Sequence, residues 1–81
     1  MKEEFIKAIA TELKILRLEN SDLQEDLANK SNVATSTISK YEAGDKTMKI
    51  NKIEQIIKPY GIDLYIFFNR ILAKTQKSEQ K

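Results

Sequence analysis

The chain has 81 residues, enough for one small domain, and its 14 basic and 12 acidic residues leave a formal net charge of only +2. It contains no cysteine and no histidine, which excludes disulfides and thiolate metal sites and removes the usual general base. No apolar run approaches membrane-spanning length and the N-terminus lacks a signal-peptide core. The chain is therefore expected in the cytoplasm, with no membrane contact, no metal and no cofactor.

The distribution of charge says more than its net value. Acidic residues gather in the first third of the chain, at Glu3, Glu4, Glu12, Glu19, Asp22, Glu25 and Asp26. Basic residues gather later, at Lys40, Lys46, Lys49, Lys52 and Lys58, with Lys74, Lys77 and Lys81 in the tail. The basic second half of the sequence indicates a polyanionic partner. The alternative interpretation is an ordinary solvated surface.

The first two predicted helices fill residues 3–30. The first runs from about Glu3 to Glu19, because apolar residues recur at three- and four-residue steps, at Ile6, Ile9, Leu13 and Leu16. Residues 20–22 interrupt that pattern. A second helix is expected to follow as far as about Lys30, with Asp22 and Glu25 spaced as a capping box.

The next two helices are bounded by glycine and proline. The third covers about residues 35–42, and Gly44 suits a left-handed turn after it. The fourth covers about residues 50–60, with an isoleucine stripe facing the core. Pro59 removes a backbone donor near its end, so the last turn is expected to be distorted or to end early, and Gly61 closes it.

Residues 62–72 fit two patterns. Alternating apolar residues suit an edge strand, whereas a second set recurs at helical spacing behind Asp63, a possible N-cap. The helical pattern accounts for more residues and is favoured. The domain is expected to span residues 1–72, and residues 73–81 are expected to form a flexible polar tail.

Residues 24–44 carry the main functional signal. Two short helical patterns flank a turn around residues 31–33, and the second pattern buries Ile38 and Tyr41 while Thr35, Ser36 and Lys40 face solvent. A short helix with small hydrogen-bonding side chains at its N-terminal end and a cation further along suits the DNA major groove.

That pattern resembles the helix-turn-helix of the Cro/cI-type (XRE) family of phage and bacterial repressors, from about Leu13 to Ile66. Residues 13–17, 24–28 and 37–44 are similar to the first helix, the second helix and the recognition helix with its exit turn. Among short members, the chain is most similar to restriction–modification controller proteins and small phage repressors. The resemblance implies an all-α, five-helix lambda-repressor-like fold with the helix-turn-helix at its second and third helices.

Five positions depart from the family pattern. Ser21 and Leu23 replace a usual glycine and a usual capping residue, and Asp22 replaces a core leucine, which leaves room for a one-residue shift where the second helix starts. Asn32 replaces the turn glycine, and asparagine tolerates the left-handed conformation. Met48 stands where a proline is common.

The resemblance implies roles for the DNA-facing residues. Base contacts fall to Thr35, Ser36 and Lys40, although either hydroxyl residue could instead cap the helix and Lys40 could reach only a phosphate. Backbone contacts fall to Gln24, Thr37, Lys46 and Lys49.

Two further sets are structural. Arg17 and Glu42 match a pair that forms an internal salt bridge in similar proteins, with two independent surface charges as the alternative. The last helix offers more apolar side chains than one core needs, so a homodimer is expected through Leu64, Phe67, Phe68 and Ile71. Which aromatic points inward stays open.

The expected function is sequence-specific transcription regulation, by a homodimer bound to double-stranded DNA at a pseudo-palindromic operator. The alternative is the antitoxin of a toxin–antitoxin pair, which a strand after Gly61 would favour. An enzyme is not expected, because the carboxylates lie on helix surfaces without a nucleophile–base pair, and neither is a small-molecule substrate.

Overall fold

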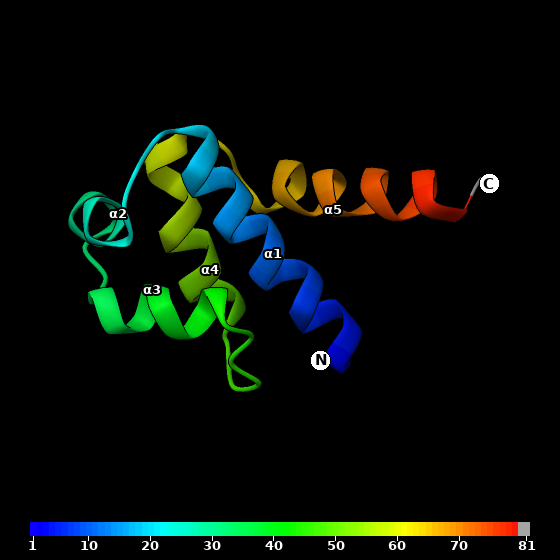
Figure 1. Cartoon of the computed structure of the whole chain (residues 1–81), viewed down its shortest axis with the longest axis horizontal. Helices are drawn as coiled ribbons and strands as arrows, with labels where there is room; N and C mark the ends of the chain where they lie inside the picture. Colours follow the sequence, from blue (N-terminus) through cyan, green and yellow to red (C-terminus); the bar gives the residue numbers. More distant parts are fainter. Residues whose placement is uncertain (80–81) are drawn as a thin grey trace.

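The computed structural model describes the backbone of residues 1–79 and the side chains of residues 1–74, and within that part every regular element is a helix. The elements are α1 (Glu3–Glu19), α2 (Gln24–Ser31), α3 (Thr35–Glu42), α4 (Ile50–Ile57), a 3-10 turn η1 (Lys58–Tyr60) and α5 (Leu64–Glu79). In Figure 1, α2 and α3 lie at one end of the molecule and α5 leaves the other end. The predicted five-helix fold is confirmed.

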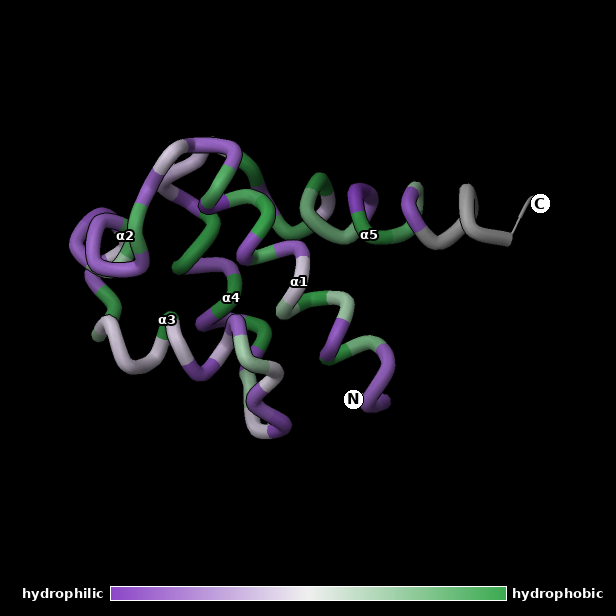
Figure 2. The backbone as a smooth tube through the Cα atoms, viewed as in Figure 1, coloured by the Kyte–Doolittle hydropathy of each residue, from purple (hydrophilic) through white to green (hydrophobic). Residues whose placement is uncertain are grey.

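The core lies where α1, α4 and the start of α5 meet the helix-turn-helix. Figure 2 shows apolar positions recurring along α1, α4 and the first turns of α5. Residues with no exposed surface come from three of them: Ile9, Ile53, Ile57 and Phe67. The three- and four-residue spacing of the apolar side chains in α1 and α4 places them on one face, and this face is the buried one.

The end of α4 follows the prediction for a proline-terminated helix. The α-helix stops at Ile57, and the residues around Pro59 form the 3-10 turn. Gly61 then takes a left-handed φ of 75°, which a residue without a side chain adopts without strain. The chain therefore turns sharply before α5.

Residues 64–79 form a helix, so the helical alternative for this segment is confirmed. Asp63 caps it, because the Ile66 N–H donates to Asp63 Oδ1 at 2.9 Å. The helical backbone of α5 continues through residues 73–79, where a flexible polar tail was expected, and the flexibility of this segment stays a prediction. Lys74 binds Glu12 on α1, which helps to extend the helix past its apolar stretch. Residues 80 and 81 lie outside the described part.

The start of α2 differs from the predicted capping box. Ser21 takes a left-handed φ of 57°, and α2 begins one residue later than Asp22 would allow as a cap. Leu23 is the N-cap, and its N–H donates to Asp26 Oδ2 at 2.8 Å. The predicted capping pair of Asp22 and Glu25 is therefore wrong. The N-cap lies at position 23, where the family usually has its capping residue, so the one-residue shift does not occur.

Asp22 turns inward instead. Its carboxylate accepts hydrogen bonds from Lys30 Nζ at 2.8 and 3.0 Å and from Tyr60 Oη at 2.7 Å. These bonds tie the turn before α2 to the end of α2 and to η1. Desolvation and the adjoining Asp22 carboxylate raise the pKa of the Tyr60 hydroxyl, which stays protonated as the donor.

A second polar cluster fastens α5 to α1. Glu12 is 2% exposed on its side chain and accepts hydrogen bonds from Arg70 Nε at 2.7 Å and from Lys74 Nζ. Arg70 also reaches Glu19, with Nη2 2.7 Å from Oε1. Because this buried carboxylate has two cationic partners, its desolvation cost is offset, and the cluster fixes the direction of α5.

Two carboxyl groups link the stability of the fold to pH. Hydrogen bonds from Lys30 and Tyr60 hold the pKa of Asp22 below its ordinary value. Burial alone would raise the pKa of Glu12, but hydrogen bonds and positive charge from Lys74 and Arg70 outweigh it and leave that pKa lowered. Such groups stabilise the fold above their unfolded pKa, and the contribution is lost as the pH falls through the folded pKa.

We therefore expect the free energy of unfolding to stay level from about pH 8 to pH 6 and to decline below about pH 5, where these carboxyls begin to protonate in the unfolded chain. No histidine is present to titrate in between. Urea unfolding followed by circular dichroism at stepped pH measures this. Glu12→Gln should lower the plateau and flatten the decline, and a main transition centred near pH 6.5 would contradict the assignment.

Within the described residues, no helix is both long enough and apolar enough to cross a membrane.

Candidate nucleic-acid interface

The turn between α2 and α3 sets the position of the exposed helix. Asn32 takes the left-handed conformation expected of it, with φ of 59°, and Val33 then enters the core. Ile38 and Tyr41 bury the inner side of α3. One side of α3 is therefore fixed in the domain and the other faces outward.

The outward side of α3 carries the three residues predicted to contact bases. Thr35, Ser36 and Lys40 are all exposed, and Thr37 is half-buried beside them. Ala34 is the N-cap, so the alternative in which Thr35 or Ser36 caps the helix is wrong. Both hydroxyl groups therefore stand on the first turn of α3.

The loop after α3 carries two of the predicted backbone-contacting residues. Gly44 has the left-handed φ of 88° predicted for the turn, and buried Met48 anchors the loop. Tyr41 Oη accepts a hydrogen bond from the Lys49 N–H at 3.0 Å, which ties the loop to α3. Lys46 and Lys49 are exposed, and Lys46 Nζ lies 3.1 Å from Glu3 Oε2 at the start of α1.

Gln24 is the first residue of α2, and the structure brings it to the end of α3. Its Nε2 donates to Glu42 Oε1 at 3.0 Å. A pocket of about 270 Å3 opens there between α1, α2 and α3, lined by Lys14, Arg17, Gln24, Ser39, Glu42 and Ala43. Sequence reasoning missed this contact, because the two residues lie on different helices.

Arg17 and Glu42 form the ion pair that the resemblance implied. Arg17 Nε lies 2.7 Å from Glu42 Oε2 and Nη2 lies 3.0 Å from Oε1, with side chains only 9% and 5% exposed. Arg17 Nη1 also donates to the Asp22 carbonyl at 2.8 Å. The hydrogen bond to Glu42 is the main cause of a raised pKa at Arg17.

The residues predicted to pair two copies occupy other places. Phe67 is 0% and Ile71 5% exposed, so both belong to the core of a single chain, and their assignment to a pairing surface is corrected. Leu64 and Phe68 are half-buried, and the Phe68 ring lies 5.6 Å from that of Phe5.

The outer side of α5 exposes Tyr65, Ile66 and Leu72 instead. Tyr65 and Leu72 are two helical turns apart and share a face. We call these three residues the outer face of α5.

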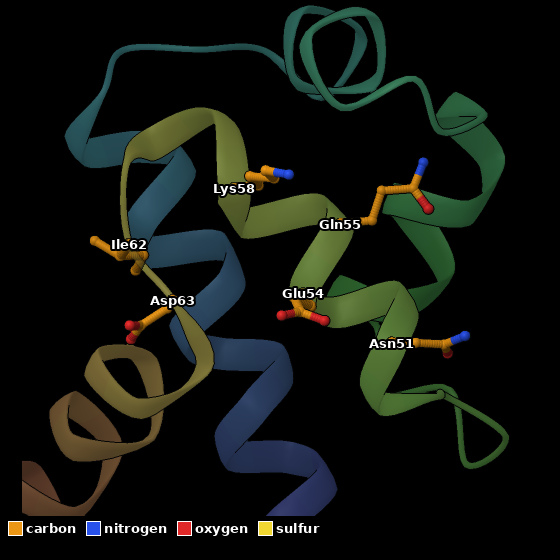
Figure 3. A pocket seen from close by; sticks show the side chains of 6 residues that line it. All are labelled: Asn51, Glu54, Gln55, Lys58, Ile62 and Asp63. Atoms are coloured by element: carbon orange, nitrogen blue, oxygen red, sulfur yellow. The ribbon is translucent and has the colours of Figure 1, made fainter.

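A larger pocket lies away from the predicted DNA-contacting residues. Its volume is about 420 Å3, and Figure 3 shows Asn51, Glu54, Gln55 and Lys58 along α4 and η1, near Ile62 and Asp63 in the connection to α5. It contains none of the predicted DNA-contacting residues.

The fold and the exposed α3 define a helix-turn-helix DNA-binding domain. Residues 13–67 match the helix-turn-helix family. The chain thus belongs to the XRE-type helix-turn-helix family of DNA-binding transcription regulators, as the sequence resemblance indicated.

Crystal structures of restriction–modification controller protein C.Esp1396I are similar over nearly the whole chain. A single-residue variant of that protein is 30% identical, with a TM-score of 0.83 over 95% of this chain and 98% of that chain. The wild-type protein is 30% identical, with a TM-score of 0.79 over 89% of this chain and 94% of that chain. No curated protein sequence matches this chain significantly.

Proposed function

We propose that the protein is a sequence-specific transcription regulator that binds a pseudo-palindromic operator as a homodimer. The observation that carries the proposal is the exposed side of α3, where Thr35, Ser36 and Lys40 stand on a helix whose opposite side is held by Ile38 and Tyr41. A rigid helix of this kind fits the major groove. The similarity to C.Esp1396I supports a role as a controller of restriction–modification genes.

In this proposal the residues on α3 discriminate between bases. The hydroxyls of Thr35 and Ser36 enter the groove first and donate or accept at base edges. Lys40 lies one turn further along and reaches guanine O6 and N7. Lys40 discriminates between bases more strongly than Thr35 or Ser36, because a hydroxyl group can hydrogen-bond to the edges of several different bases.

The flanking residues hold the DNA backbone. Gln24 at the start of α2 and Thr37 on α3 contact phosphates by hydrogen bonds, and Lys46 and Lys49 contact them through charge. Lys46 would give up its ion pair with Glu3 and form one with a phosphate at small cost. Both side chains are exposed, and such surface ion pairs contribute little to stability.

The outer face of α5 supplies the pairing surface. Tyr65, Ile66 and Leu72 are exposed apolar side chains on one element, and soluble chains seldom leave such a surface uncovered. Two-fold pairing through this face would give two α3 helices for two half-sites. The antitoxin alternative loses its main support, because residues 65–68 are helical rather than extended.

Lys40→Ala and Lys46→Ala should weaken DNA binding in different ways. Loss of a base contact should cost about 1–3 kcal/mol at one operator position and flatten the preference there. Loss of a phosphate contact should weaken operator and unrelated DNA alike. It should also reduce the slope of log affinity against log salt by about 0.9 for each lysine, or about 1.8 per dimer.

Fluorescence anisotropy with operator and scrambled duplexes across a salt series measures both effects. Lys58→Ala is the matched control, because Lys58 is exposed on η1, outside the α3 surface and its loop. Equal losses on both duplexes for both variants would remove Lys40 from base recognition. Operator binding that ignored salt would overturn the whole surface.

A further inference from the structure

We propose that Glu42 is a positioning residue that holds the Gln24 amide toward the DNA backbone. This inference rests on the proposed function and names a residue that does not itself touch DNA. Gln24 is half-exposed at the start of α2, where a glutamine side chain would ordinarily sample several rotamers. Its bond to Glu42 Oε1 restricts those rotamers before DNA arrives.

The amide group has enough donors for both partners. Gln24 Nε2 carries two hydrogens, and one of them is given to Glu42 at 3.0 Å. The second hydrogen remains available to a phosphate oxygen. The directions of the two N–H bonds differ by a fixed angle, because the amide group is planar. Binding to Glu42 therefore defines where the phosphate-facing hydrogen points.

Glu42 is itself held rigidly, which is what a positioning group requires. Arg17 grips both of its oxygens at 2.7 and 3.0 Å. The third contact of Arg17, at 2.8 Å to the Asp22 carbonyl, fastens the guanidinium to the turn just before α2. These hydrogen bonds connect Asp22 to Arg17, Arg17 to Glu42, and Glu42 to Gln24. The helices α1, α2 and α3 therefore share one hydrogen-bonded network.

Charge alone and the proposed positioning role predict opposite effects of removing Glu42 on DNA affinity. The direction of the change in affinity therefore tests the proposal. A carboxylate near a phosphate repels it, so removing Glu42 should tighten DNA binding if charge alone mattered. If Glu42 orients Gln24, removing it should weaken binding, because the amide must then be ordered during association.

The experiment is a double-mutant cycle on operator affinity with Gln24→Ala, Glu42→Ala and the combined variant. Each protein is assayed by anisotropy at a temperature where circular dichroism shows it folded. Glu42→Ala should weaken binding about threefold to tenfold in the parent chain and should cause no further weakening beside Gln24→Ala. Glu54→Ala removes the same charge from the exposed side of α4 and should leave affinity unchanged or slightly tighter.

Three outcomes would overturn the inference. They are tighter binding by Glu42→Ala, an equal loss in both backgrounds, and no effect of Gln24→Ala. In each of these the parent protein still binds its operator, so the proposed function stands. If the parent protein binds no DNA, the proposed function fails and takes the inference with it.

A measurement on the unaltered protein covers the case in which Glu42→Ala does not fold. NMR relaxation of the Gln24 side-chain amide, without DNA, should give an order parameter close to that of rigid backbone, about 0.85. A value below about 0.6 would mean a mobile amide and would overturn the proposal.

Discussion

Replacing Phe67 with alanine is expected to destabilise the domain by about 3–5 kcal/mol. Phe67 is 0% exposed and belongs to the core formed with α1 and α4, and its ring lies 5.5 Å from that of Phe68. The substitution removes a large apolar group and leaves a cavity. Natural domains are stable by only about 5–15 kcal/mol in total, so a substantial fraction of the variant should be unfolded on mild heating.

Urea and thermal unfolding followed by circular dichroism measure the loss. The matched control is Leu18→Ala, because Leu18 is a large apolar residue of α1 that is 55% exposed. Substitutions at such a surface position usually change stability by less than about 0.5 kcal/mol. Similar losses for the two variants would mean that Phe67 does not belong to the core.

A charged residue on the outer face of α5 is expected to separate the proposed dimer without unfolding the chain. Leu72→Asp and Tyr65→Asp place a carboxylate where a partner helix would pack, and both positions are exposed in the single chain. Each monomer would then hold one half-site alone. Since linkage of two binding modules raises affinity by about 10²–10⁴, operator affinity should fall by at least about a hundredfold.

Sedimentation measures the association, and anisotropy measures the operator affinity. Leu18→Asp introduces the same charge on α1, outside the outer face, and should leave a dimer. Dimers in both α5 variants would place the interface elsewhere, as would a parent protein that stays monomeric at tens of micromolar (roughly). A charge at Phe67 cannot serve this test, because it would fall in the core and unfold the chain.

The helices were predictable from local patterns. The apolar spacing in α1 extends over several turns, so its limits at Glu3 and Glu19 could be predicted from the sequence. Gly44 and Gly61 mark backbone conformations that few other residues adopt, so the turns they close were also predictable. These signals depend on neighbours in the sequence alone.

The orientation of α5 was not predictable in the same way. Its apolar residues cover more than one face, and only the positions of α1 and α4 decide that Phe67 faces inward while Tyr65 faces outward. The buried Glu12 was missed for a related reason. A carboxylate inside an apolar stripe is stable only with its partner, and Arg70 lies 58 residues away.

The part of α5 that extends beyond the core has a consequence for how the spacing of operator half-sites could diverge. The helix continues to Glu79, so it leaves the domain as a straight rod with a defined origin at the Glu12 and Arg70 pair. In the proposed dimer, the position at which the two α5 helices cross sets the distance between the two α3 helices. Sliding that crossing by one helical turn moves it about 5.4 Å along the rod. Half-sites on DNA lie about 34–36 Å apart, so a change of a few outer-face side chains could retune the spacing of an operator while every base-contacting residue stays the same.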